Sequence, residues 1–250
     1  MEIPELRHIA CLDKKEIGGL LYVAYEDYVS ARILLLSGSL MNGCILANTS
    51  LEKLLKALIF YCGENNLKKY QHRAHQLLDD LNKKGFKPNI NREFLSALSM
   101  IYDSRYIGDN NKVKPGYNFT IVKNKFLAEL DYTVDLLGNT IVAKSKPKPN
   151  VKTAVEICNL NRTNPQIRNG NYLYLGMSKD VYCTGLEDIL ELRVLSNYET
   201  IIWKYQTLGS KNDGKFSYET LAGIDRKTPG ESYANPTHKP INETVELEML

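Results

Sequence analysis

The segment from Cys44 to Cys62 constrains the fold more than any other part of the chain. Its apolar residues recur at steps of three, four and one, at Ala47, Leu51, Leu54, Leu55, Leu58 and Cys62. This is the period of an α-helix with one buried face. Glu52 and Lys56 lie four residues apart and are expected on the opposite, solvated face. We therefore predict a central, largely buried helix over residues 44–62.

Four further segments show helical periodicity. We predict helices over residues 16–37, 73–84, 91–102 and about 118–137. Asn91 is expected to be the N-cap of the third of these, and glycines follow the ends of several. The fifth helix is expected to end at Gly138. Together with 44–62, these segments predict a five-helix up-and-down bundle over residues 16–140.

The periodicity changes from 3.6 to 2 in the second half of the chain. Residues 141–152 are rich in Lys and Pro, which is typical of a linker. We predict a smaller, mostly antiparallel β domain over 153–222 and a loop and tail over 223–250. The fold class is therefore α+β, with the helical bundle followed by the β domain.

Three patterns support the strands. Apolar and charged residues alternate over 190–194 and 201–207, although the spacing within 186–205 also fits a helix. A hairpin is expected where 171–175 and 180–183 flank Gly176–Lys179, and Asn212–Gly214 is a turn signal before Phe216.

The composition excludes several classes of protein. The 250 residues are 43% hydrophobic, with no apolar run long enough to span a membrane, and we expect no secretory signal. The five cysteines form no C-x-x-C pair, which favours free thiols and a cytoplasmic location. Neither a G-x-S-x-G nor a P-loop motif occurs. We predict no cofactor.

The charge is unevenly distributed along the chain. Residues 1–150 contain 21 Lys and Arg against 16 Asp and Glu, a net charge of +5, whereas residues 151–250 contain 11 against 13, a net charge of −2. The basic first half is compatible with an anionic partner.

Four fragments of the first half resemble the HEPN domain family. They are YEDY at 25–28 followed by Ala31, LEKLLKA at 51–57, HQLLDDL at 75–81 and DSRY at 103–106, and they occur in the family's order. The last fragment resembles the family's R-Y-P signature, with Ile107 in place of Pro. The resemblance covers roughly residues 15–140, and it leaves the second half unassigned.

This resemblance implies a helical bundle that dimerises. Many members of the family are metal-independent ribonucleases of toxin or phage-defence systems, with an Arg followed after four to six residues by a catalytic His. Other members bind nucleotides or protein partners, some of them beside a nucleotidyltransferase. Here the required positions after Arg105 are Asn110, Asn111 and Lys112, and no other Arg has a His at that spacing. The nuclease signature is absent.

We therefore predict a nucleotide- or RNA-binding accessory module without catalytic residues. The expected ligand-binding residues are Arg105, Tyr106, His75, Arg73 and Lys112. His72, His75 and Asp79 share a helix face that suits a metal, but no metal is predicted.

The expected partners are a nucleotide or RNA, a nucleotidyltransferase-type protein and a second copy of the chain, which would dimerise through the bundle; no membrane is expected. Two alternatives stay open. One is a ribonuclease with a rearranged site around Arg105, Tyr106 and His75, and the other is a purely structural interaction module.

Overall fold

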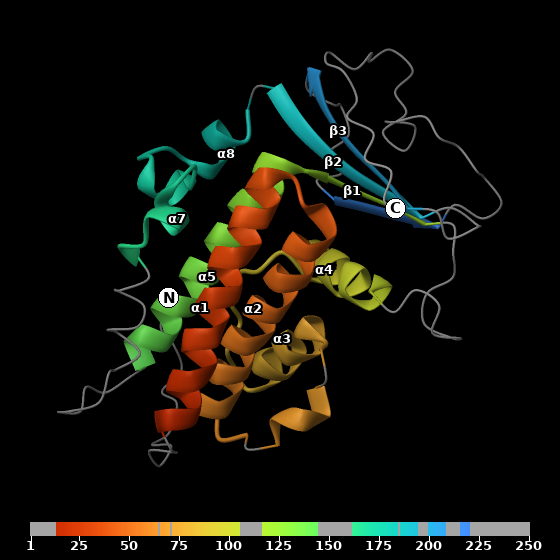
Figure 1. Cartoon of the computed structure of the whole chain (residues 1–250). Coiled ribbons are helices and arrows are strands. Elements are labelled where there is room, and N and C mark those ends of the chain that lie inside the picture. The colour runs from red at the N-terminus through yellow and green to blue at the C-terminus, as the bar shows by residue number, and fades with distance from the viewer. Residues whose placement is uncertain are drawn as a thin grey trace.

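The computed structural model describes residues 14–64, 66–70, 72–105, 117–144, 162–184, 186–194, 200–208 and 216–220. Within these residues the fold is α+β, with helices in the N-terminal half and a four-stranded antiparallel sheet across one end of the helices (Figure 1). No helix of the described part is both long and apolar enough to cross a membrane. The predictions for Tyr106, Lys112, residues 145–152 and 223–250, and the turn at 212–214 lie outside the described residues.

Helices α1 (Lys14–Ser37) and α2 (Leu40–Tyr61) form an antiparallel hairpin, as predicted, although α2 begins four residues before Cys44. Gly38 permits the tight connection because its φ of 86° lies in the left-handed region. Gly43 permits the close approach, since a Cβ there would lie 2.6 Å from Cγ of Leu35. The two helices therefore pack with their backbones close together.

Helix α2 is the buried centre of the bundle, and it contacts α3, α4 and α5 as well as α1. Its predicted apolar face is correct, because Leu51, Leu54 and Leu55 are fully buried. The placement of Glu52 on a solvated face is wrong, since only 4% of this residue is exposed. Its carboxylate is compensated inside the fold by Lys56 and His72.

A short 3₁₀ helix, η1 (Leu67–Tyr70), leads to α3 (Ala74–Lys83), and α4 (Arg92–Ser104) follows. The predicted cap of α4 is confirmed. Asn91 Oδ1 accepts hydrogen bonds from the backbone N–H groups of Glu93 at 2.9 Å and Phe94 at 3.2 Å. Helix α4 ends at Ser104, so its C-terminal turn presents the following residue, Arg105, beside the bundle.

The prediction of one helix over 118–137 is wrong. Residues Tyr117–Val122 form strand β1, and helix α5 spans Lys123–Lys144 with Gly138 inside it. Phe119 and Val122 fit a helical stripe, but the run from Phe119 to Val122 is aromatic and β-branched. Pairing on both edges of β1 decides the outcome, because strands from the second half of the chain lie on either side of it.

The sheet has the order β3-β2-β1-β4, with β2 at Leu186–Val194, β3 at Thr200–Leu208 and β4 at Phe216–Thr220. The strands predicted from the alternation over 190–194 and 201–207 are confirmed, and the helical alternative is wrong. In the register, Phe119 opposes Leu192 and Ile121 opposes Leu190. These four side chains belong to the same hydrophobic core as the bundle.

The predicted hairpin around Gly176–Lys179 is wrong. Residues 162–184, which we call the bridging segment, contain the short helices α7 (Pro165–Arg168) and α8 (Lys179–Tyr182) and the 3₁₀ turn η2 (Tyr172–Tyr174). The side chains of Asn164, Asn171 and Ser178 each accept a hydrogen bond from the backbone at the start of one turn. These local caps favour short helical turns over the strands that the alternating tyrosines predicted.

The sheet joins the two sides of the division predicted at 141–152. Strand β1 comes from the first side and lies between β2 and β4 from the second. We expect a chain cleaved at a protease site inserted after Asn150 to elute from a sizing column as one species in native buffer. In denaturing urea the two fragments should separate. Elution as two separate folded fragments in native buffer would contradict this prediction.

Candidate functional site

Arg105 and Tyr102 meet at the C-terminal end of α4. The guanidinium carbon of Arg105 lies 3.6 Å from the centre of the Tyr102 ring. The two residues are three positions apart in the helical turn, which places their side chains on one face. A guanidinium that lies over an aromatic ring still carries N–H donors in its own plane. These donors suit a carboxylate or phosphate.

His72 approaches the same ring from the connection between η1 and α3. Its ring centre lies 4.7 Å from that of Tyr102, with an angle of 41° between the planes. Its Nδ1 lies 3.0 Å from Oε2 of Glu52 on α2. The His72 side chain is 51% exposed, whereas that of Glu52 is 5% exposed. We call Glu52, His72, Tyr102 and Arg105 the Tyr102 cluster.

The buried carboxylate fixes the orientation of the imidazole. Glu52 also accepts a hydrogen bond from the ammonium of Lys56, so it is held from two sides. Because an ionised carboxylate only accepts hydrogen bonds, Nδ1 of His72 carries the proton in this contact. The Nε2 edge of the ring is then the part of the imidazole that is left to contact a ligand.

The structure does not bring all the predicted site residues together. Arg105 lies in the Tyr102 cluster, and the histidine beside Tyr102 is His72. His75 lies half-buried in α3, and Arg73 is exposed directly before that helix. Asp79 pairs with Arg92 at 2.8 Å. Within the described part of the chain, no group of three His, Cys, Asp or Glu residues could hold a metal ion.

Sequence reasoning missed three members of the cluster. Tyr102 ends the helix predicted from Asn91 through 102, and its spacing of three from Arg105 is a signal that could have been used. The contacts of His72 with Tyr102 and Glu52 have no such signal, because the three residues belong to different elements.

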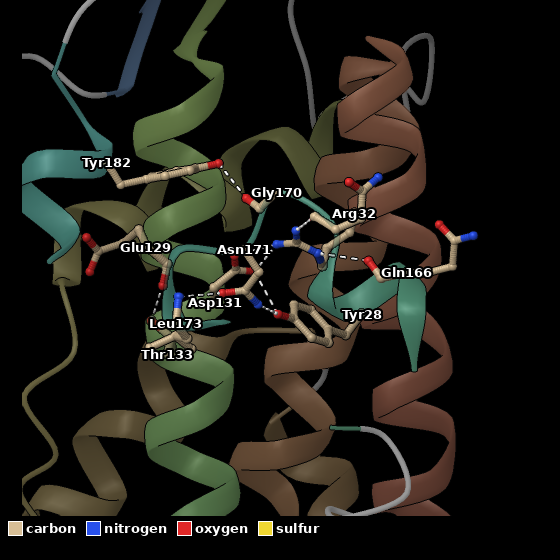
Figure 2. Close-up of polar contacts among 11 residues, drawn as sticks. Tyr28, Arg32, Glu129, Asp131, Thr133, Gln166, Gly170, Asn171, Leu173 and Tyr182 are labelled. Carbon is tan, nitrogen blue, oxygen red and sulfur yellow. Dashed lines mark hydrogen bonds and ion pairs between the residues drawn. The ribbon is translucent and has the colours of Figure 1, made fainter. Parts of the chain in front are cut away.

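A second polar centre lies inside the fold, between α1 and α5 (Figure 2). Arg32 and Asp131 are both fully buried, and Nη1 of Arg32 contacts both carboxylate oxygens of Asp131. The hydroxyl of Tyr28 donates a hydrogen bond to Oδ1 of Asp131 at 2.6 Å. A buried charge of this kind is tolerated only when it is paired, so this centre fixes α1 against α5.

The same arginine holds the bridging segment against the bundle. Arg32 donates hydrogen bonds to the backbone carbonyls of Gln166, at 3.4 Å, and Asn169. Asn171 Nδ2 donates to the Tyr28 oxygen at 3.3 Å, as Figure 2 shows. One guanidinium therefore connects α1, α5 and residues 166–169. This buried centre is structural, because its main groups are closed to solvent.

Burial also changes the acid–base properties of this centre. It raises the pKa of Asp131 to about 6, against the opposing effects of the Arg32 charge and the hydrogen bonds. Burial, together with the charge of Asp131, raises the pKa of Tyr28 well above its usual value. At neutral pH Asp131 is therefore ionised and Tyr28 keeps the proton that it donates.

Comparison with known proteins finds a family match in the N-terminal part of the chain. Residues 19–120 match the family model of the HEPN domain. The matched range contains α2, α3, α4 and the Tyr102 cluster, and most of α1. No curated protein and no solved structure gives a significant match to the chain.

Proposed function

We propose that the protein binds a nucleotide or RNA at the Tyr102 cluster, because residues 19–120 match the family model of the HEPN domain. The observation that carries this proposal is the Arg105 guanidinium held over Tyr102 beside the half-exposed His72. A cation and an aromatic ring, both fixed in place, suit the phosphate and the base of a nucleotide.

Charge supports the same ligand. Arg105 offers in-plane donors to phosphate oxygens, and the exposed Arg73 follows His72 in the chain. The net charge of +5 over residues 1–150 attracts an anion from a distance. We propose that Arg73, His75, Tyr106 and Lys112 also contribute to the site.

We propose binding without cleavage, because the Arg-to-His spacing of the nuclease signature is absent. The second candidate function is a ribonuclease with a rearranged site, and the Glu52–His72 contact favours it. An imidazole oriented by a carboxylate next to an arginine is an arrangement that can transfer protons. Incubating mixed RNA with the protein and a metal chelator, then running a gel, separates the two. Cleavage that disappears in His72→Ala would establish the second function.

We also propose a homodimer formed through the helical bundle and an accessory role beside a nucleotidyltransferase-type protein. The exposed apolar side chains of Tyr22, Val23 and Ile33 on α1 support an interface on the bundle. Sedimentation equilibrium measures this association directly, and a strictly monomeric chain would reject the dimer.

Arg105→Ala is expected to weaken RNA binding by about 1.5–3 kcal/mol, the range for a hydrogen bond to a charged group. Arg105→Lys should recover only part of the loss, because an ammonium cannot make the planar two-point contact. Binding should also weaken with added salt. The measurement is a fluorescence anisotropy titration of labelled single-stranded RNA, with circular dichroism to confirm that each variant is folded.

The matched control is Arg168→Ala. Arg168 also lies over a tyrosine ring, with its guanidinium carbon 5.5 Å from the centre of Tyr174, but it belongs to the bridging segment. This variant should bind RNA like the wild type. Equal affinities for the wild type and Arg105→Ala would remove Arg105 from the site and reject the proposal at this position.

A further inference from the structure

We infer that the outer side of the His72 ring is a stacking surface for a nucleobase, while Arg105 holds the phosphate of the same ligand. This inference rests on the proposed function and assigns a part of the site that the sequence did not indicate. It begins from the exposure of His72, which is unusual for a side chain with two fixed contacts.

The geometry leaves a free side on the ring. Tyr102 is 2% exposed and lies against one side of His72, with the ring centres 4.7 Å apart. The His72 side chain nevertheless keeps 51% of its surface exposed. Because Tyr102 covers one side of the ring, we infer that the exposed part is the opposite side. A planar base can pack there and extend the aromatic pair by one ring.

The ring is held in place before any ligand arrives. Glu52 contacts Nδ1, and Glu52 is itself buried and bonded to Lys56. A side chain that is already ordered loses little conformational entropy on binding, so stacking on it is more favourable than on a mobile histidine. The charge of Glu52 is compensated by its contact with Lys56 and does not repel a phosphate from this position.

The arrangement of His72 and Arg105 selects the class of ligand. Both contact the same tyrosine ring, His72 at 4.7 Å and Arg105 at 3.6 Å from its centre. We infer from this shared contact that one nucleotide reaches both residues, with its base on the imidazole and its phosphate on the guanidinium. A free phosphate or a phosphorylated sugar would engage only the arginine. The ligand class that uses both groups is a nucleoside monophosphate or a nucleotide of single-stranded RNA.

The test compares ligands with and without a base. By isothermal titration calorimetry, the wild type should bind AMP about tenfold more tightly than ribose 5-phosphate, the low end for stacking of one base. His72→Ala should remove this preference, so that AMP and ribose 5-phosphate bind with similar affinity. His72→Phe should keep the preference, because it retains the aromatic surface and loses the ring nitrogens.

A fluorescent base gives an independent readout. The monophosphate of 2-aminopurine riboside should be quenched on binding to the wild type and to His72→Phe, and not by His72→Ala. A preference for AMP that survives in His72→Ala, or equal binding of AMP and ribose 5-phosphate by the wild type, would overturn the stacking surface and leave phosphate binding intact. If neither ligand nor single-stranded RNA binds the wild type, the proposed function itself fails.

Discussion

Asp131→Ala is expected to lower the free energy of unfolding by about 3–5 kcal/mol, the usual loss when one partner of a buried ion pair is removed. The guanidinium of Arg32 would remain fully buried without its counter-charge, and Tyr28 would lose the acceptor of its hydroxyl. The loss should affect the whole fold, because Arg32 also holds the backbone at Gln166 and Asn169. Two helices and the bridging segment depend on this one carboxylate.

The measurement is urea denaturation at about pH 7.5, above the pKa of about 6 that burial gives Asp131, so that this carboxylate is ionised. Circular dichroism follows the helices, and the fluorescence of the single tryptophan, Trp203 in β3, follows the sheet. The control is Asp135→Ala, one turn further along α5. Asp135 pairs with Arg162 at 3.2 Å, and its side chain is 36% exposed. This variant should lose less than about 1 kcal/mol.

A double replacement distinguishes pairing from packing. Arg32→Leu combined with Asp131→Leu should be more stable than Asp131→Ala, because two apolar side chains leave no unpaired charge inside the fold. If Asp131→Ala and Asp135→Ala lose the same small amount, the ion pair does not hold α1, α5 and the bridging segment together.

The sequence predicts the helices of the bundle best where their signals are local. The apolar stripe of α2 and the Asn91 cap of α4 are determined by residues within one or two turns, and both are correct. Strand β1 could not be identified in this way. Phe119 and Val122 fit both periods, and the choice depends on pairing with Leu190 and Leu192, about seventy residues away in the chain.

The same distinction between local and long-range contacts applies to the candidate site. The contact between Arg105 and Tyr102 follows from a spacing of three in one helical turn and could have been predicted. The contacts of His72 depend on how α2, α4 and the start of α3 pack, which no local pattern contains. The buried ion pair did leave a trace in the sequence. Arg32 lies four residues after Tyr28 on the buried face of α1, and such a charge in an apolar stripe indicates a buried partner.

Leu55→Ala is expected to lower the free energy of unfolding by about 2–5 kcal/mol, the range for removing a buried leucine side chain. Leu55 is fully buried. It lies in the middle of α2, within the shared core of helices and sheet. The loss has two parts, the apolar surface no longer buried and the cavity that rigid neighbours leave behind. Leu55→Met keeps most of the volume and should lose less than about 1.5 kcal/mol.

The control on the same helix is Asn42→Ala, because Asn42 is exposed and its replacement should change stability by less than about 0.5 kcal/mol. Lys56 does not serve this purpose, since it pairs with the buried Glu52. Urea denaturation of the three variants beside the wild type gives the comparison. If Leu55→Ala and Asn42→Ala have equal effects, the buried face assigned to α2 is wrong. If Leu55→Met loses as much as Leu55→Ala, the site depends on the shape of the leucine rather than on filled volume.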